Sequence, residues 1–144
     1  MNTTQKCILI VEDDTSLQHG LVDKFTREGF KVLSANNGAA GLAMALINHP
    51  DVILLDVIMP QMDGFVMLQR LRESGAWGKS VGVIFLTNLS ADSDKVMARI
   101  TADEPAFYLV KSGVMLHDVV VKVNECLEAM KTRKEQEEAQ GAAK

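Results

Sequence analysis

Four apolar runs of this chain each end in a polar residue that could take part in phosphoryl chemistry. KCILIVEDD ends on Asp13 and Asp14, DVILLD on Asp56, VGVIFLT on Thr87 and AFYLVK on Lys111. If these runs are neighbouring strands of one parallel sheet, their carboxyl ends meet at the edge where such sheets bind ligands. The sequence then predicts one pocket that holds three carboxylates, a hydroxyl and an ammonium group.

This set of side chains suits a divalent cation and a phosphoryl group. Two charges about 4 Å apart repel each other by roughly 4 kcal/mol at an effective dielectric of 20. A hard cation with oxygen ligands, such as Mg²⁺, offsets that repulsion. Lys111 and Thr87 would hold phosphoryl oxygens. Asp56 is the best candidate for a nucleophile that forms an aspartyl phosphate, because it ends the central apolar run.

Each of these residues, taken singly, has a more ordinary interpretation. An Asp or Thr after a strand is usually a helix cap or a turn former, and a lone Lys is usually solvated. The functional interpretation depends on their occurrence together, at the ends of four separate strands.

The elements that must position these residues alternate along the chain. Apolar runs predict five strands, and helical spacing predicts five helices. The strands are expected at Lys6–Glu12, Lys31–Ala35, Asp51–Asp56, Val81–Leu86 and Ala106–Val110. The helices are expected from Leu17 to Gly29, Gly38–Asn48, Gly64–Glu73, Ser90–Thr101 and from near Gly113 to Met130, with residues 74–80 as a glycine-rich connection. This alternation predicts a parallel sheet covered on both faces.

Composition narrows the class of protein. The chain has 144 residues, of which 47% are apolar and 24% charged, as expected for one soluble domain. The net charge of −4 argues against nucleic-acid binding, and every apolar run is shorter than the roughly 20 residues of a membrane span. Cys7 and Cys126 lack the spacing of a metal or redox motif and fit reduced thiols in the cytoplasm.

The domain is expected to end where the apolar stripe of the last helix ends. That stripe stops at Met130, and the residues that follow are polar throughout. We therefore predict a domain over residues 1–131 and a polar C-terminal tail or linker over 132–144, in which the helix frays. No heptad repeat continues beyond Met130, so at most a weak homodimer is expected beside the monomer.

The motifs together resemble the receiver domain of two-component response regulators, in its single-domain, chemotaxis-regulator-like form. The matching segments cover roughly residues 6 to 130 and are VEDD, LLDVIMPQMDG, IFLTN and FYLVKS. The resemblance implies an α/β fold of the flavodoxin-like type, with a doubly wound five-stranded parallel sheet of order 2-1-3-4-5 and five helices.

The resemblance also implies a metal site and a phosphorylation site. Asp56 would accept a phosphoryl group from a sensor histidine kinase or a phosphotransfer protein. Asp14 and Asp56 would bind Mg²⁺ directly, with the backbone carbonyl of Ile58, and Asp13 would act through a metal-bound water. The chain would be a phosphoacceptor with no enzyme activity beyond its own phosphorylation and dephosphorylation.

A conformational switch is implied by the same resemblance. Thr87 and Lys111 would hold the phosphoryl oxygens, and Tyr108 would turn inward as Thr87 moves toward the phosphate. Because a phosphoryl group adds up to two negative charges and three acceptors, it can bias an existing equilibrium between two states. A downstream protein, which the sequence does not identify, would dock on the face that changes.

Two residues depart from the family pattern, Ser112 and Asn88. Ser112 follows Lys111 where the family usually has proline, and a cis bond there would cost about 3–4 kcal/mol, so we expect a shifted lysine or a strained bond. Asn88 stands where a very small residue is usual, and its larger side chain should restrict the access of water or a phosphatase to the phosphoryl group. Ile58, two residues after Asp56, is apolar and cannot orient an attacking water. Both residues therefore predict a long-lived phosphorylated form.

Two other functions compete with this interpretation. A phosphatase of the haloacid dehalogenase type requires a second Asp two residues after the nucleophile, where this chain has Ile58 and hence no general acid. A receiver-like module that binds partners without phosphorylation remains an alternative, because Ser112 and Asn88 lie beside the expected phosphoryl site.

Overall fold

The computed structural model describes residues 5–87, 106–110 and 115–142. In these ranges the side chains of Thr87, of residues 106–108, of Val110 and of residues 141–142 are not described. The helix predicted at residues 90–101 lies outside the described residues.

The strands form a parallel sheet of order β2-β1-β3-β4-β5. They are β1 (Cys7–Val11), β2 (Lys31–Ala35), β3 (Val52–Asp56), β4 (Gly82–Thr87) and β5 (Ala106–Val110). All five residues of β3 are buried, as expected for a central strand covered on both faces. The predicted α/β fold with a doubly wound parallel sheet is confirmed, and the strands begin and end within one residue of their predicted bounds.

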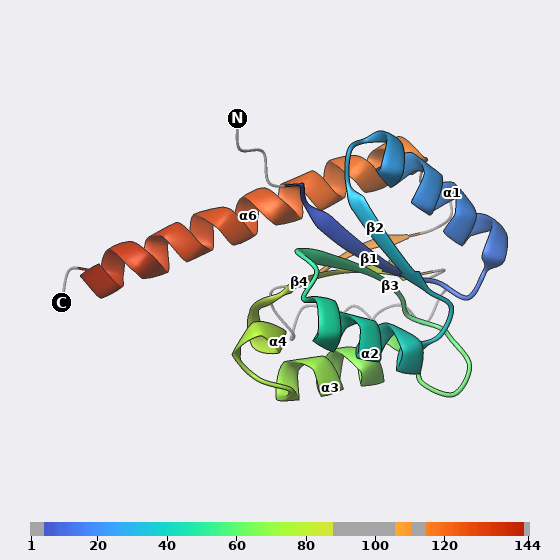
Figure 1. Cartoon of the computed structure of the whole chain (residues 1–144), viewed down its shortest axis with the longest axis horizontal. Coiled ribbons are helices and arrows are strands. Elements are labelled where there is room, and N and C mark those ends of the chain that lie inside the picture. Colours follow the sequence, from blue (N-terminus) through green and yellow to red (C-terminus); the bar gives the residue numbers. More distant parts are fainter. Residues whose placement is uncertain (1–4, 88–105, 111–114, 143–144) are drawn as a thin grey trace.

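Helices cover both faces of the sheet, and Figure 1 shows α1 and α6 on one side with α2 and α3 on the other. The described helices are α1 (Thr15–Arg27), α2 (Gly38–Asn48), α3 (Gly64–Glu73), α4 (Ala76–Ser80) and α6 (Leu116–Ala142). None of them is long and apolar enough to cross a membrane.

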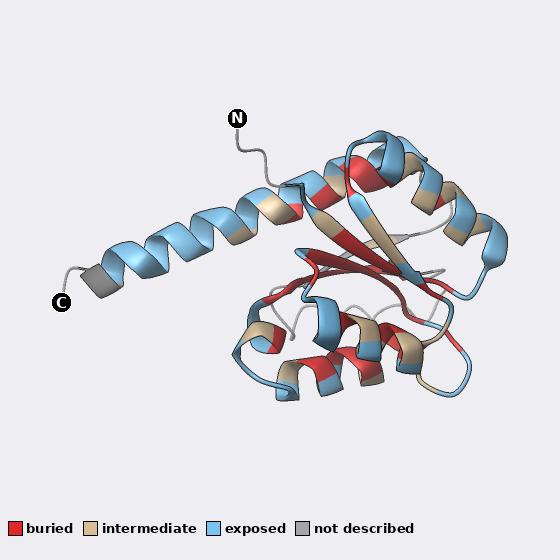
Figure 2. Ribbon diagram, viewed as in Figure 1, coloured by how far each residue is buried: buried red, intermediate tan, exposed pale blue. Residues whose placement is uncertain are grey.

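Alternate residues of the strands point to the two faces of the sheet, and the buried residues form two cores. Figure 2 shows that the central strands of the sheet are buried over most of their length. Leu9, Leu55 and Phe85 pack with α2 and α3 in one core. Ile8, Leu54 and Ile84 pack with α1 and α6 in the other. The sheet is thus held from both sides, and its carboxyl edge is fixed by packing on each face.

The starts of the helices follow local capping rules. The side chain of Asp14 accepts from the backbone N–H of Leu17 at 3.0 Å and caps α1, and Asp63 accepts from Val66 at 2.9 Å and caps α3. Asn37 caps α2 in the same way, through Ala40 at 2.8 Å. Two of these three helices therefore begin at the carboxyl edge with an Asp whose carboxylate is already engaged.

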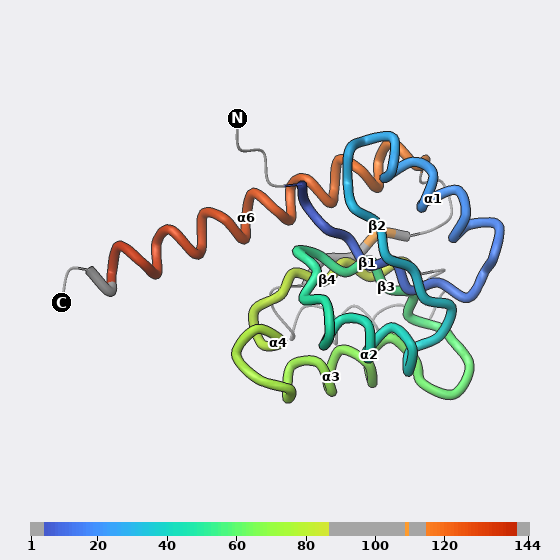
Figure 3. The backbone as a smooth tube through the Cα atoms, in the orientation of Figure 1, coloured from blue at the N-terminus to red at the C-terminus, as the bar shows by residue number. Residues whose placement is uncertain are grey.

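Two elements differ from their prediction. Residues 76–80, predicted as part of a connection, form the short helix α4. The Arg72 side chain holds this helix by donating to the carbonyl oxygen of Gly78 at 2.8 Å and to that of Val81, just after the helix, at 2.7 Å. The last helix does not fray after Met130 but continues to Ala142 (Figure 3). Its polar end consists mostly of strong helix formers and includes an Arg133–Glu137 ion pair one turn apart, so it needs no apolar stripe to be helical.

Candidate functional site

The carboxyl edge of the sheet brings the ends of β1 and β3 level with each other. Val11 pairs with Leu55, so Glu12, the next residue, stands level with Asp56. Asp56 pairs in turn with Leu86 of β4. The polar residues that follow these strands therefore meet in one place, as predicted for a parallel sheet.

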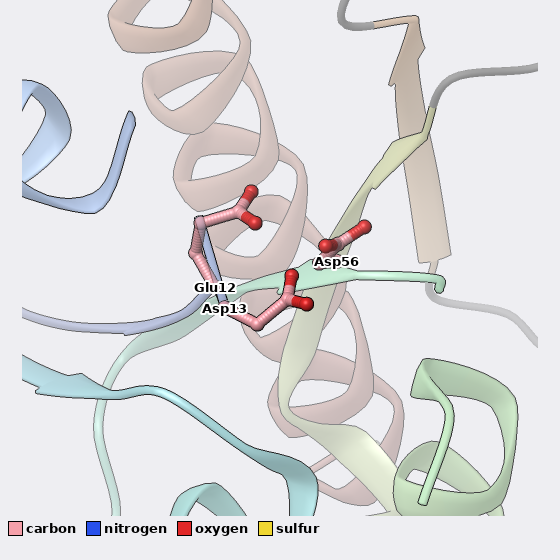
Figure 4. Close-up of side chains that lie close together, drawn as sticks. All are labelled: Glu12, Asp13 and Asp56. Carbon is pink, nitrogen blue, oxygen red and sulfur yellow. The ribbon is translucent and has the colours of Figure 1, made fainter. Parts of the chain in front are cut away.

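Three carboxylates converge at this edge, and they belong to Glu12, Asp13 and Asp56 (Figure 4). Each offers a ligand oxygen, and the three oxygens lie within 4.8 Å of one another. Glu12 is fully buried and Asp56 is 3% exposed, whereas Asp13 is exposed to solvent. We refer to these residues as the acidic cluster.

The backbone after Asp56 turns sharply around its carboxylate. The N–H of Ile58 donates to Oδ1 of Asp56 at 3.3 Å, and the N–H of Gly64 donates to the carbonyl of Val57 at 2.8 Å. A Cβ on Gly64 would collide with the carbonyl oxygen of Asp56 and lie 3.0 Å from Cα of Val57. The start of α3 therefore packs directly against the strand end that carries Asp56, and only glycine leaves room for it.

Asp14 does not join the acidic cluster, and this corrects the sequence prediction. The structure groups Glu12 with Asp13 and Asp56, while the carboxylate of Asp14 caps α1. The acidic pair predicted from the segment VEDD, Asp13 and Asp14, leaves out Glu12. A signal was available, since an Asp three residues before Leu17, the first apolar residue of the helical pattern, is typical of an N-cap.

The other predicted site residues are placed only in part. Thr87 ends β4 opposite Val110, and Tyr108 lies in β5 opposite Phe85; the structure describes neither side chain. Lys111 lies outside the described residues, as do Asn88 and Ser112. Ile58 lies beside the acidic cluster and is 69% exposed.

The acidic cluster has the chemistry of a site for a hard divalent cation. Mg²⁺ prefers oxygen ligands and is commonly bound by one or two carboxylates together with waters and phosphate oxygens. Two buried carboxylates and one exposed carboxylate at close range provide such ligands and leave a side open to solvent. The residues present therefore fit Mg²⁺.

Comparison with known proteins agrees with this geometry. The family described as the response regulator receiver domain matches residues 8–115. Protein PilH of Pseudomonas aeruginosa is 35% identical over 92 residues, which are 64% of this chain and 75% of PilH. The probable transcriptional regulator ycf27 of Cyanophora paradoxa is 31% identical over 112 residues, which are 77% of this chain and 44% of that protein. The chain thus spans less than half the length of several curated relatives that it matches.

Solved structures are similar over most of the chain. A CheY-like response regulator receiver domain protein from Methanospirillum hungatei has a TM-score of 0.78 at 25% identity, over 90% of this chain and 99% of that one. The chemotaxis protein CheY4 of Vibrio cholerae has a TM-score of 0.77 at 24% identity, over 85% and 99% of the two chains, which shows a shared fold.

Proposed function

This chain belongs to the response regulator receiver domain family of two-component systems, and from this premise we propose that Asp56 accepts a phosphoryl group. The observation that carries the proposal is the acidic cluster, which sets the buried Asp56 beside Glu12 and Asp13 at the carboxyl edge of the sheet. The phosphoryl group would come from a sensor histidine kinase or a phosphotransfer protein.

The acidic cluster would hold Mg²⁺ during the transfer, with the backbone carbonyl of Ile58 as a further proposed ligand. When bound, the cation neutralises charge on the carboxylates and on the phosphoryl oxygens. Glu12 and Asp13 are the proposed acidic partners, and Asp14 keeps its role as the cap of α1.

In the transfer step, a carboxylate oxygen of Asp56 attacks the phosphorus atom of the phosphohistidine. A P–O bond to Asp56 forms, the P–N bond breaks, and the imidazole leaves with the electron pair of that bond. The remaining role of the protein is to position groups and balance charge, because phosphoryl transfer asks for little covalent chemistry from its surroundings. Thr87 and Lys111 are proposed to hold the phosphoryl oxygens.

The phosphoryl group would then change a surface to which a downstream protein binds. The phosphoryl group carries up to about two negative charges, but the Asp56 carboxylate loses its own charge in the new P–O bond, so the end of β3 gains about one negative charge and three acceptor oxygens. We propose that Thr87 and Tyr108 respond as the switch pair, since β4 and β5 are neighbouring strands that carry them. In this role the chain is a signalling phosphoacceptor and not an enzyme with a separate substrate. The two free cysteines fit a cytoplasmic location.

Intact mass measured after incubation with acetyl phosphate and MgCl₂ tests the proposal. We expect a phosphate-sized mass gain in the wild type, none in Asp56→Asn, and none when Mg²⁺ is chelated. Asp51→Asn is a matched control, because Asp51 lies at the amino end of β3 and its carboxylate accepts from the N–H of Cys7 at 2.7 Å. A wild type that gains no mass with acetyl phosphate or with a range of histidine kinases would favour the phosphorylation-independent binding module instead.

A further inference from the structure

Glu12 is held in place by hydrogen bonds just beyond the end of β1, to β2 and to the start of α1. Its backbone N–H donates to the carbonyl of Ala35 at the end of β2, at 3.1 Å. Its carboxylate accepts from the backbone N–H of Asp14 at 3.1 Å, through Oε2. Pairing of β1 with β3 ends one residue earlier, at Val11. The position of Glu12 therefore depends on β2 and on the start of α1.

The side chain of Gln18, in α1, also bonds to the backbone at the ends of β1 and β2. Its side-chain Nε2 donates to the carbonyl oxygen of Glu12 at 3.2 Å and to that of Ala35 at 2.9 Å. Both partners are acceptors, so the amide nitrogen, with its two hydrogens, must face them. One half-buried amide group thus joins the ends of β1 and β2 to the end of the first turn of α1.

We propose that Gln18 is a positioning residue for the acidic cluster. It acts through the backbone of Glu12, which it fixes against β2 so that the Glu12 carboxylate stays beside Asp13 and Asp56. The inference rests on the proposed Mg²⁺ site, because its consequence is the affinity of that site.

The need for such a residue follows from the charges in the acidic cluster. Three carboxylates at close range repel one another, which opposes their close approach. A restraint on the backbone of Glu12 counteracts that repulsion and preorganises the ligands. Outer partners that orient metal ligands typically contribute about 10- to 100-fold to metal affinity. Gln18 reaches a backbone and not a ligand atom, so we expect the lower figure.

The test compares Gln18→Met with Gln69→Met. Methionine has nearly the length and helix propensity of glutamine but no donor. Gln69 lies exposed on α3, where its amide contacts only Glu73 among the described partners, at 3.4 Å. Binding of Mn²⁺, used as the probe for the site, is measured from the electron paramagnetic resonance signal of the free ion. We expect the dissociation constant to rise about ten-fold in Gln18→Met and to stay unchanged in Gln69→Met.

A second readout needs neither metal nor phosphorylation. The N–H of Asp14 donates to the Glu12 carboxylate, so its ¹H–¹⁵N resonance reports the position of that carboxylate. We expect this resonance to move upfield in Gln18→Met, because the bond to the carboxylate lengthens. Gln18→Asn carries the same amide on a side chain one methylene shorter. Gln18→Asn should therefore give the same upfield shift of the Asp14 resonance, and it replaces Gln18→Met in the test if that variant does not fold.

A structural role alone would give a different pattern. It would lower the melting temperature and the fraction of folded protein, while the folded molecules kept the wild-type Mn²⁺ affinity and Asp14 resonance. That result would overturn the inference. If the wild type binds Mn²⁺ but is not phosphorylated, the proposed function fails and the affinity comparison still stands. If it does not bind Mn²⁺ either, the Asp14 resonance alone decides whether Gln18 positions Glu12.

Discussion

Asp56 and Ile58 lie two residues apart, and one is a buried carboxylate whereas the other is an exposed apolar residue. The Asp56 carboxylate is buried at the strand end, and the Ile58 side chain points into solvent two residues later. An apolar side chain offers no hydrogen-bond acceptor to a water molecule that could attack the aspartyl phosphate. Ile58 therefore favours a phosphoryl group that persists.

We predict that the phosphorylated wild type decays slowly and that Ile58→Asn shortens its lifetime several-fold, because the amide can orient water. Decay is followed by intact mass after acetyl phosphate is removed. Ile47→Asn is the matched control, since Ile47 is 81% exposed near the end of α2, the helix that precedes the amino end of β3. Wild-type dephosphorylation within seconds would contradict the prediction.

Cys126 links the stability of the protein to alkaline pH. Burial raises the pKa of its thiol from 9.0 to about 11, because the thiolate is poorly solvated between α6 and the start of β4. The unfolded chain then releases the proton at lower pH than the folded chain does. Stability from the neutral thiol is present in full below about pH 9 and is lost as the pH rises toward about 11.

We therefore expect the free energy of unfolding in urea to fall between pH 9 and pH 11 by more in the wild type than in Cys126→Ala. Other groups titrate in this range in both proteins, so the difference between the two isolates the thiol. Parallel curves for the two proteins would show that Cys126 does not titrate in this range on unfolding.

At the scale of elements, α1 and α3 begin beside the acidic cluster and contact the backbone of the strand ends that carry it. Asp14 and Asp63 cap these helices, and Gly64 lets α3 approach the end of β3 more closely than any other residue would allow. The helices thus position the cluster through their first turns, while their buried faces hold them on the sheet.

Two glycine-to-alanine substitutions separate this close approach from helix propensity. Gly64→Ala forces a Cβ against the carbonyl of Asp56, and we expect a loss of about 1–3 kcal/mol in unfolding free energy together with weaker Mn²⁺ binding. Gly20→Ala places its Cβ 3.7 Å from Cδ1 of Leu116, an ordinary contact, and should stabilise α1 by about 0.5–1 kcal/mol. Urea denaturation measures the change in unfolding free energy for each substitution, and Mn²⁺ titration measures the binding. A Gly64→Ala protein as stable as the wild type would contradict the proposed crowding.

At the scale of the whole molecule, α6 reaches well beyond the sheet that its first half covers (Figure 1). Val119, Val123 and Cys126 are buried against the sheet and α1, whereas residues 131–140 are all exposed. The second half of α6 is therefore a solvated helix that adds length without adding core.

We predict that truncation after Met130 changes the free energy of unfolding by no more than about 0.5 kcal/mol, as exposed residues usually do. Truncation after Val123 removes Cys126 and Met130 from the core and should cost several kcal/mol. Urea denaturation of the three proteins measures both effects. A large loss of unfolding free energy on truncation after Met130 would show that the domain extends beyond the predicted residue 131.

Local patterns were enough to predict most of the fold. β2, β5, α2 and α3 have their predicted bounds, because apolar runs, capping residues and glycines act over a few neighbours. The strand ends that carry Asp13 and Asp56 were predicted for the same reason. The short helix α4 and the length of α6 were not, since a glycine-rich segment and a polar segment look alike whether they are helical or not.

The sequence by itself determined that carboxylates gather at the carboxyl edge of a parallel sheet, since each strand ends where its apolar run ends. Only the tertiary structure decided that Glu12 is one of them. Glu12 enters the cluster, because the pairing of Val11 with Leu55 sets it level with Asp56, while the carboxylate of Asp14 caps α1. Such contacts join residues from different elements, and the order of residues along the chain does not encode them locally.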